Sequence, residues 1–365
     1  MSKFFYILLL FVVLCASACK KVRKLPIVKP APDSVIVVAD TIIVKDTIIK
    51  VPDTIKPIPV IKNGRITSAE YIDSLLFVDK NEFRISASDS ATFSSSDASI
   101  TITSDGLIKR LTSGEVVSIK VKWLRNGNEV TIYALGATDD NHVNPFIKFH
   151  AAASDNPLGQ YKQGWKTLQQ LPLRGESFAI VLRHADADNG KDYNLTHPKE
   201  VGPVNWWKSP DSTLARQLNT QGIVRATEIG TVFKDLGYPI VRVVSSEFFR
   251  AVRTAQLINA GPTIQIDGRI NHPDYIKSGQ SLFKGLQHIL NEAPADGQMT
   301  LISTHHPINE FEREKIPVAS FPQVSVFNWT GAYFVKISSD KTLTYEGAAS
   351  YGMFKLWRDF KLKGR

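Results

Sequence analysis

The sequence predicts a three-layer α/β sandwich with a mostly parallel sheet, preceded by a small all-β sandwich. Three apolar runs near 177–183, 239–245 and 299–304 contain almost no turn-forming residues and indicate buried, parallel-type strands. Segments with helical spacing of apolar residues separate these runs, as expected for strand–helix alternation. Upstream, short alternating runs lie between turn signals. The 365 residues are enough for one domain of each kind.

Residues 1–18 predict a signal peptide. A short basic start precedes an apolar stretch at 4–14 that is too short for a persuasive membrane-spanning helix. Small residues then lead to Cys19, a pattern that resembles the bacterial lipoprotein signal and implies lipid on the thiol after cleavage. A plain secretory peptide and an uncleaved anchor stay open. We expect export and a lipid anchor in a bacterial membrane. Because Lys20 is not Asp, analogy favours the outer membrane, facing the periplasm or the cell surface.

Residues 19–62 predict a disordered, Pro-rich linker. They are rich in Pro, Val, Ile, Lys and Asp, and Asp-Thr-Ile recurs three times. Alternating Val and Ile favour strands, but Pro52, Pro57 and Pro59 confine any strand to a sheet edge. A basic cluster beside the lipid site could contact anionic headgroups.

Residues 64–140 predict a small β domain. Alternation is visible in 99–103 and 116–123, and Asp105-Gly106 and Asn126-Gly127 mark turns. The order of these runs resembles the bacterial Ig-like domain. The module has no catalytic grouping, so we expect a spacer, with glycan or protein contact as the alternative.

Residues 175–350 predict the α/β domain, after a connector at 141–174 and before a basic C-terminal tail at 351–365. Its further expected elements are strands near 263–267 and 331–337 and helices near 211–237 (broken at Gln221-Gly222), 250–259 and 279–291.

The loop after the first strand of this domain lacks periodicity and is placed to form a pocket rim or lid. It carries Trp206 and Trp207. These indoles could bind substrate by stacking on a sugar or an aromatic leaving group, whereas packing onto the body of the domain is the alternative explanation.

Polar side chains follow three of the predicted parallel strands. Arg183 and His184 end the first strand, Arg250 lies in the first helical turn after the second, and His305 follows the third. Open α/β sheets bind ligands beyond the carboxyl ends of their strands. An imidazole beside guanidiniums is a candidate nucleophile next to an anion-binding group. The sequence therefore predicts a phosphate-binding pocket at this edge.

The order strand–Arg-His, strand–Ser-Ser-x-x-x-Arg-x-x-x-Thr-Ala and strand–x-x-His-His-Pro resembles the phosphoglycerate-mutase-like histidine phosphatase superfamily, over 175–350. The last motif is most similar to the phosphohistidine-phosphatase branch. The resemblance implies that His184 attacks phosphorus and becomes a phosphohistidine. It implies that Arg183 and Arg250 hold the phosphoryl oxygens, and that His305 is the second histidine of the pocket. Neighbouring cations lower the pKa of His184, which favours the neutral, attacking imidazole.

The general acid departs from the family pattern. The family commonly has a carboxylate after the strand that follows the second arginine, but here His272 stands in that place, with Asp274 two residues on. Either side chain could protonate a leaving alkoxide. Asp186 and Asp188, just after the nucleophile, are rivals. An Asp would need a raised pKa, whereas a His starts close to the useful range.

We therefore expect a metal-independent phosphoric monoester hydrolase that cleaves a phosphate monoester or a phosphoramidate through His184, on a phosphorylated small molecule or phosphoprotein. We expect no cofactor, because metal-ligand spacing is missing and arginines can neutralise phosphate. The net charge of +9 would attract anions, but no nucleic-acid-reading motif occurs, so no nucleic-acid partner is expected. Nothing supplies the second phosphate site of a mutase. The alternative is a non-catalytic surface binding or adhesion protein that uses the Ig-like module and a phospho-ligand-binding domain.

Overall fold

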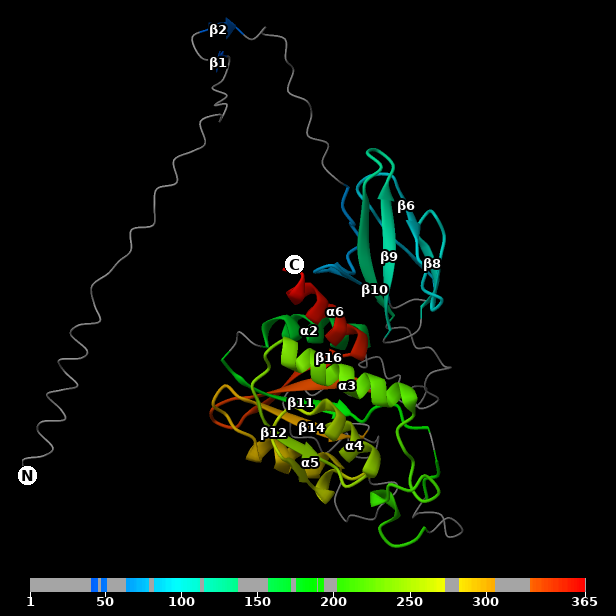
Figure 1. The fold of residues 1–365 in the computed structure, drawn as a ribbon, viewed down its shortest axis with the longest axis vertical. Helices are drawn as coiled ribbons and strands as arrows, with labels where there is room; N and C mark the ends of the chain where they lie inside the picture. Colours follow the sequence, from blue (N-terminus) through cyan, green and yellow to red (C-terminus); the bar gives the residue numbers. More distant parts are fainter. Residues whose placement is uncertain are drawn as a thin grey trace, which may run out of the picture. The chain divides into compact units, whose positions relative to one another are not determined.

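The computed structural model of the protein contains two compact units, Met1–Ile61 and Lys62–Arg365. In the first unit, strand β1 (Thr41–Val44) pairs antiparallel with β2 (Thr47–Lys50) (Figure 1). Thr, Ile and Val dominate both strands, and no proline interrupts them. The expected linker therefore contains a two-stranded hairpin at these residues, and its disorder stays a prediction. The structure is described for residues 41–44, 47–50, 64–78, 82–111, 115–136, 157–171, 175–188, 190–193, 202–272, 282–305 and 329–364.

The second unit begins with a β module that contains two sheets. The larger sheet has the order β3 (Tyr71–Ile72), β4 (Leu75–Val78), β10 (Glu129–Gly136), β9 (Val116–Trp123) and β6 (Ala91–Ser94). The smaller sheet has the order β5 (Phe83–Arg84), β8 (Leu107–Leu111) and β7 (Ile100–Ile102). Alternate residues of β9 are buried, which is the period of a strand with one face on a core. The expected β sheets are present, and the Ig-like topology stays a prediction.

A six-stranded sheet forms the centre of the α/β region. Its order is β13 (Ile264–Ile266), β12 (Ile240–Ser245), β14 (Met299–Thr304), β11 (Ser177–Arg183), β15 (Ala332–Ile337) and β16 (Leu343–Ala349). Neighbours among the first four strands are parallel, whereas β15 and β16 pair antiparallel. β11 and β14 are buried along nearly their whole length, as parallel strands between helical layers are. The predicted α/β region with a mostly parallel sheet is confirmed.

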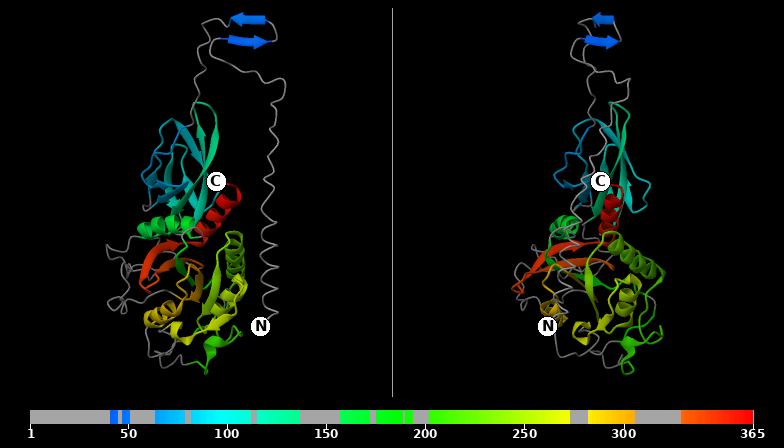
Figure 2. Two further views of the ribbon diagram at one scale, coloured as in Figure 1. Left: turned by 90° about the vertical axis from the view of Figure 1, so that its left-hand side faces the viewer. Right: turned by 60° about the vertical axis from the view of Figure 1, so that its left-hand side comes forward.

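Helices cover both faces of this sheet. They are α2 (Pro157–Gln170), α3 (Thr220–Asp235), α4 (Phe249–Ile258), α5 (Leu282–Glu292) and α6 (Tyr351–Leu362), with short 3-10 turns η2 (Trp206–Lys208) and η3 (Gly268–Ile270). α5 lies on the opposite side of the sheet from α2 and α6 (Figures 1 and 2). Among the described residues, no helix has the length and apolar content needed to cross a membrane.

The helices differ from the sequence prediction in three places. The helix expected over 211–237 begins only at Thr220, because the Asn219 side chain accepts a hydrogen bond from the Gly222 N–H and caps it. The expected connector at 141–174 contains α2, and the expected tail at 351–365 contains α6. Both helices bury aromatic side chains in the main core, so they are parts of the fold rather than a connector and a tail.

The β module and the α/β region share one hydrophobic core. Leu75, Phe77 and Leu135 of the module belong to the same buried cluster as the central strands. An ion-pair chain adds to this contact. Arg225 of α3 lies 2.9 Å from the Glu115 carboxylate of the module and 3.1 Å from a carboxylate oxygen in the loop after β11. The module is therefore packed against the α/β region, and its role as a spacer stays a prediction.

Helix α2 lies against strand β16 backbone to backbone. A Cβ atom at Gly164 would approach the Ala348 carbonyl oxygen to 1.8 Å, so only glycine fits there. Opposite it, Gly347 has a φ of +90°. The Gln163 side chain also donates a hydrogen bond to the Tyr345 carbonyl at 3.3 Å. The helix thus contacts the backbone of the last strand at Ala348 and Tyr345.

Candidate active site

The predicted site residues follow the carboxyl ends of adjacent parallel strands. β11 pairs with β14 up to Arg183 opposite Thr304, so the residues that follow both strands lie side by side. The His184 N–H donates to the Thr304 carbonyl at 2.8 Å, and the Ser246 N–H after β12 donates to the Ser303 carbonyl at 3.0 Å. The expected convergence of strand ends is therefore present in the structure.

His184 is buried and held in one tautomer. Its Nδ1 lies 2.8 Å from the Ala185 carbonyl, which can only accept a hydrogen bond, so Nδ1 carries the proton. The Ala185 N–H in turn donates to the Thr254 hydroxyl at 3.0 Å, which fixes the turn after the histidine. Nε2 is then unprotonated and accepts from Nε of Arg250 at 3.1 Å. The nitrogen available for nucleophilic attack faces a guanidinium.

The charge on His184 is strongly disfavoured. Burial, followed by the positive charges of Arg250 and Arg183, holds the pKa of His184 well below its usual range. The imidazole is therefore neutral at neutral pH, as a nucleophile requires.

His305 lies beside His184 and is also buried. The two ring centroids are 5.3 Å apart with the planes at 69°. Nε2 of His305 lies 2.9 Å from the Ser246 hydroxyl, and its ring contacts Phe248 edge to face with centroids 4.5 Å apart. These contacts fix the second histidine against the first.

Arg250 is positioned by a buried carboxylate that the sequence did not reveal. Its Nη1 lies 3.0 Å from Asp192, and both side chains are only 3 % exposed. Asp192 also pairs with Arg216 at 3.2 Å, and the charge of Arg216 contributes to the lowered pKa of His184. The structure therefore adds a third arginine and an acid to the predicted set. The sequence offered two weak signals for these residues, namely an Asp in the loop after His184 and an Arg shortly before helix α3.

Arg183 lies at the end of β11 with its backbone N–H donating to the Gly331 carbonyl at 3.0 Å. Its guanidinium carbon is 5.2 Å from the ring centroid of Trp329, within cation–π range. Its charge acts on the pKa of both His184 and His272. The four strand-end residues of the prediction are thus brought into one site.

His272 lies in the same site, but its protonation state is opposite to the one expected of a general acid. Its ring centroid is 5.6 Å from that of His305. Burial, then the charges of Arg250, Arg183 and Arg216, lowers the pKa of His272 to about 3. At neutral pH it is therefore a neutral imidazole, without the imidazolium proton that a general acid would donate. Asp274 lies outside the described residues.

Asp186 and Asp188, the other candidates for the general acid, contact side chains that hold the fold together. Asp186 is buried and pairs with Arg225, and burial raises its pKa despite that partner. Asp188 accepts a hydrogen bond from the Asn219 side chain at 2.8 Å. Both contacts join the nucleophile loop to the start of α3.

The two tryptophans of the loop do not form an open stacking surface. Trp206 is 1 % exposed and packs on Phe248, with ring centroids 5.9 Å apart. The Trp206 ring therefore fills the core that supports the site, and substrate contact by Trp206 stays a prediction. Trp207 is half-buried, and its Nε1 donates to Glu247 at 3.3 Å. Substrate contact by Trp207 stays a prediction.

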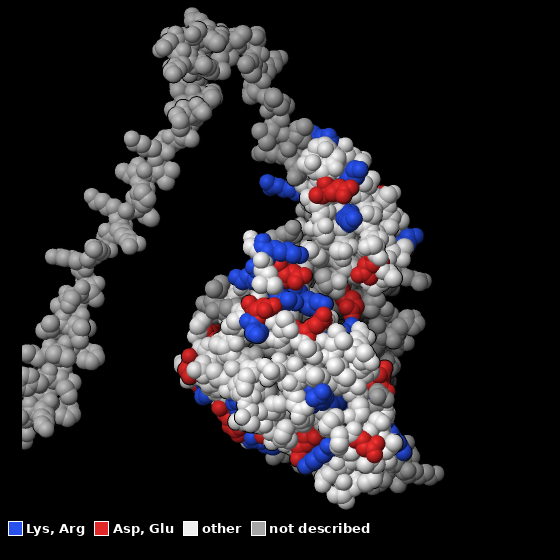
Figure 3. Space-filling model, in the orientation of Figure 1, with Lys and Arg blue, Asp and Glu red and all other residues white. Residues whose placement is uncertain are grey.

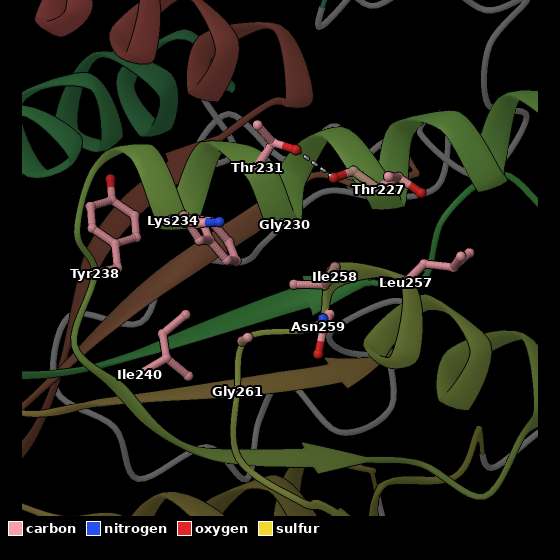
Figure 4. A pocket seen from close by; sticks show the side chains of 12 residues that line it. Thr227, Gly230, Thr231, Lys234, Tyr238, Ile240, Leu257, Ile258, Asn259 and Gly261 are labelled. Carbon is pink, nitrogen blue, oxygen red and sulfur yellow. Dashed lines mark hydrogen bonds between the residues drawn. The ribbon is translucent and has the colours of Figure 1, made fainter.

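A separate cavity of about 390 Å³ lies between α3 and α4 (Figure 4). Its lining includes Thr227, Lys234 and Asn259 and none of the predicted site residues. The Thr231 hydroxyl donates to the Thr227 carbonyl at 3.2 Å, so this hydroxyl is already satisfied. Among the described residues, no group of three or more His, Cys, Asp or Glu side chains is placed to hold a metal ion.

No protein-family model matches the chain, and no curated protein matches it. Solved structures give distant matches. The protein histidine phosphatase SixA complexed with tungstate is 17 % identical over 48 % of this chain and 97 % of its own, with a TM-score of 0.34. Mycobacterial hydrolase 1 is 13 % identical over 48 % of this chain and 99 % of its own, at 0.33. The mycobacterial glucosyl-3-phosphoglycerate phosphatase bound to VO3 is 14 % identical over 46 % of this chain and 95 % of its own, at 0.32.

Proposed function

We propose that this chain is a phosphatase that works through a phosphohistidine on Nε2 of His184. The observation that carries the proposal is the state of that imidazole. Its Nδ1 proton is held by the Ala185 carbonyl, its charge is suppressed, and its free nitrogen faces Arg250. A neutral imidazole beside fork-shaped cations is suited to attack a phosphate group whose oxygens those cations bind.

In the first step the phosphoryl oxygens bind Arg183, Arg250 and Arg216, and the substrate displaces the hydrogen bond between Arg250 and His184. Nε2 then attacks phosphorus while the bond from phosphorus to the leaving group breaks. The leaving group takes the bonding electron pair and accepts a proton. In the second step water attacks phosphorus, the P–N bond breaks, and neutral His184 and inorganic phosphate result. Catalysis here rests on positioning and on charge stabilisation by guanidiniums, without a required metal.

The proton for the leaving group has no assigned donor among the described residues. His272 is unprotonated before substrate binds, although a bound dianion would offset the arginine charges that lower its pKa. We propose Asp274 and His272 as the candidates. Alkyl phosphates need a proton donor more than aryl phosphates do, so rates on both should be compared for His272→Ala and Asp274→Ala. Unchanged alkyl-ester rates in both variants would exclude both donors.

The proposal is tested by hydrolysis of an aryl phosphate by the purified full-length protein. His184→Ala should abolish turnover and the alkali-stable, acid-labile label that a phosphohistidine gives. The matched control is His288→Ala, since His288 is exposed on α5. Equal rates for wild type and His184→Ala would overturn the proposal.

The alternative function is phospho-ligand binding without turnover. The lowered pKa of His272 favours it, because a neutral imidazole there is a poor proton donor for a leaving group. It predicts that the wild-type protein binds inorganic phosphate or tungstate but hydrolyses neither aryl nor alkyl phosphates, and the same assays separate the two functions.

On the face shown in Figure 3, basic and acidic side chains are interspersed, which does not favour a nucleic-acid surface.

We further propose that the protein is exported and held at a bacterial membrane by lipid on Cys19, with the β module as an Ig-like domain that could contact glycan or protein. Metabolic labelling with a fatty acid tests the anchor. Wild type should incorporate label and Cys19→Ala should not, and label in both proteins would refute this site of attachment.

A further inference from the structure

A short arch formed by Trp329, Thr330 and Gly331 lies directly behind the nucleophile. The Gly331 carbonyl accepts from the Arg183 N–H at 3.0 Å, and the Thr330 N–H donates to the His184 carbonyl at 3.4 Å. The ring of Trp329 lies 5.2 Å from the guanidinium carbon of Arg183. Backbone and side-chain contacts therefore join the arch to both residues of the Arg-His pair.

The arch is energetically costly. Thr330 is a β-branched residue with a φ of +61°, a conformation that such residues rarely adopt. Its side chain is completely buried, and its hydroxyl has no hydrogen-bond partner within the described part of the chain. Both features disfavour this backbone unless the surrounding structure enforces it, and such strained positions cluster at functional sites.

The indole of Trp329 is the part of the arch that reaches the chemistry. Arg183 and Arg250 each have an aromatic ring within cation–π distance, because Arg250 lies 4.5 Å from the Phe248 centroid. Arg250 is also held by the buried Asp192. The Trp329 indole contacts Arg183 in turn, and this contact limits the rotamers of the long Arg183 side chain.

We propose that Trp329 is a positioning residue that holds the Arg183 guanidinium in the orientation that binds the phosphoryl group. The proposal rests on the phosphatase function proposed above. It predicts that anion binding depends on the electron density of the Trp329 ring, because a cation–π contact depends on that electron density and not on ring volume alone.

The test measures the dissociation constants of inorganic phosphate and tungstate, and kcat/KM on an aryl phosphate, for the full-length protein. Trp329→Leu should weaken anion binding by about tenfold, whereas Trp329→Phe should retain part of the contact and lose roughly threefold. Replacing the indole at this position with mono-, di- and trifluorotryptophan should weaken binding stepwise, because fluorine removes electron density with little change in size. Because these analogues keep the shape of the ring, they test the proposal even where the Leu variant folds poorly.

Trp357 supplies the matched control. It makes the same kind of contact, with Lys361 at 5.3 Å on α6, away from the site residues. Fluorination there should leave anion binding unchanged. Equal losses for the Phe and Leu variants, or no trend across the fluorinated series in an active protein, would overturn the role of Trp329 alone. A wild-type protein that neither binds these anions nor hydrolyses the ester would overturn the proposed function, and this inference with it.

Discussion

The buried ion pair between Arg250 and Asp192 gives a quantitative prediction for Asp192→Asn. The two side chains are 3.0 Å apart and each is 3 % exposed. Removing one partner of such a pair costs about 3–5 kcal/mol, because the other charge stays buried without compensation. We expect the lower end, about 3 kcal/mol, because the amide oxygen of the variant can still accept a hydrogen bond. For a protein of this size that loss lowers Tm by roughly 6 °C.

The same variant should respond more strongly to phosphate. In this variant a bound anion replaces the missing negative charge beside Arg250. The anion is also no longer repelled by the Asp192 carboxylate, so it should bind more tightly. Thermal melting of the full-length protein with and without inorganic phosphate measures both effects. The control is Asp211→Asn, since Asp211 is exposed and its carboxylate accepts hydrogen bonds from Thr213, two residues further on. Wild-type stability in Asp192→Asn, or a phosphate-induced Tm shift no larger than that of the wild type, would refute the reasoning.

Three further predictions concern the nucleophile and its supports. Because the pKa of His184 is lowered, the fall in kcat/KM on an aryl phosphate that accompanies protonation of this imidazole should occur below pH 6.5. Arg250→Gln removes a positive charge that lowers this pKa, so the fall should move to higher pH. Arg225→Met leaves the buried Asp186 carboxylate unpaired and should cost about 3 kcal/mol of stability by urea unfolding, an idea that unchanged midpoints would contradict. Leu135→Ala in the β module should cost about 3 kcal/mol in a single calorimetric transition, whereas two separate transitions would show that the core is not shared.

The sequence was sufficient to predict that His184 and His305 lie close together, because both follow buried strands. The runs that end at Arg183 and precede His305 have no turn residues inside them, so their strand assignment is secure. The carboxyl ends of parallel neighbours share one edge of a sheet, and this brings His184 and His305 together without any knowledge of the loops.

Asp192 and Arg216 could not be assigned in this way. Asp192 lies in a loop without periodicity, and Arg216 lies where a helix was expected but the chain is irregular before Thr220. In such segments only the folded backbone decides which polar side chain turns inward. The lowered pKa of His272 was equally hidden, because it results from burial and from three arginines far apart in the sequence.

The sequences of helices α2 and α6 contain apolar residues that face the core, but the polar and charged residues between them suggested a connector and a tail. Tyr161, Trp165 and Leu168 are spaced i, i+4, i+7 and are buried, which is the pattern of one helical face. Phe354 and Phe360 similarly face the core from a segment whose lysines and arginines suggested a tail. Charges on the outer face of a helix do not exclude an apolar inner face.

The glycine contact between α2 and β16 has a consequence for association between copies of the protein. An uncovered last strand would offer a row of carbonyl and amide groups to a neighbouring molecule, which is a route to edge-to-edge association. The close approach at Gly164 places a helix against the backbone at Ala348, and Gln163 donates a hydrogen bond to the Tyr345 carbonyl. At these two positions a neighbouring molecule therefore meets a helix rather than a free strand, which disfavours pairing there.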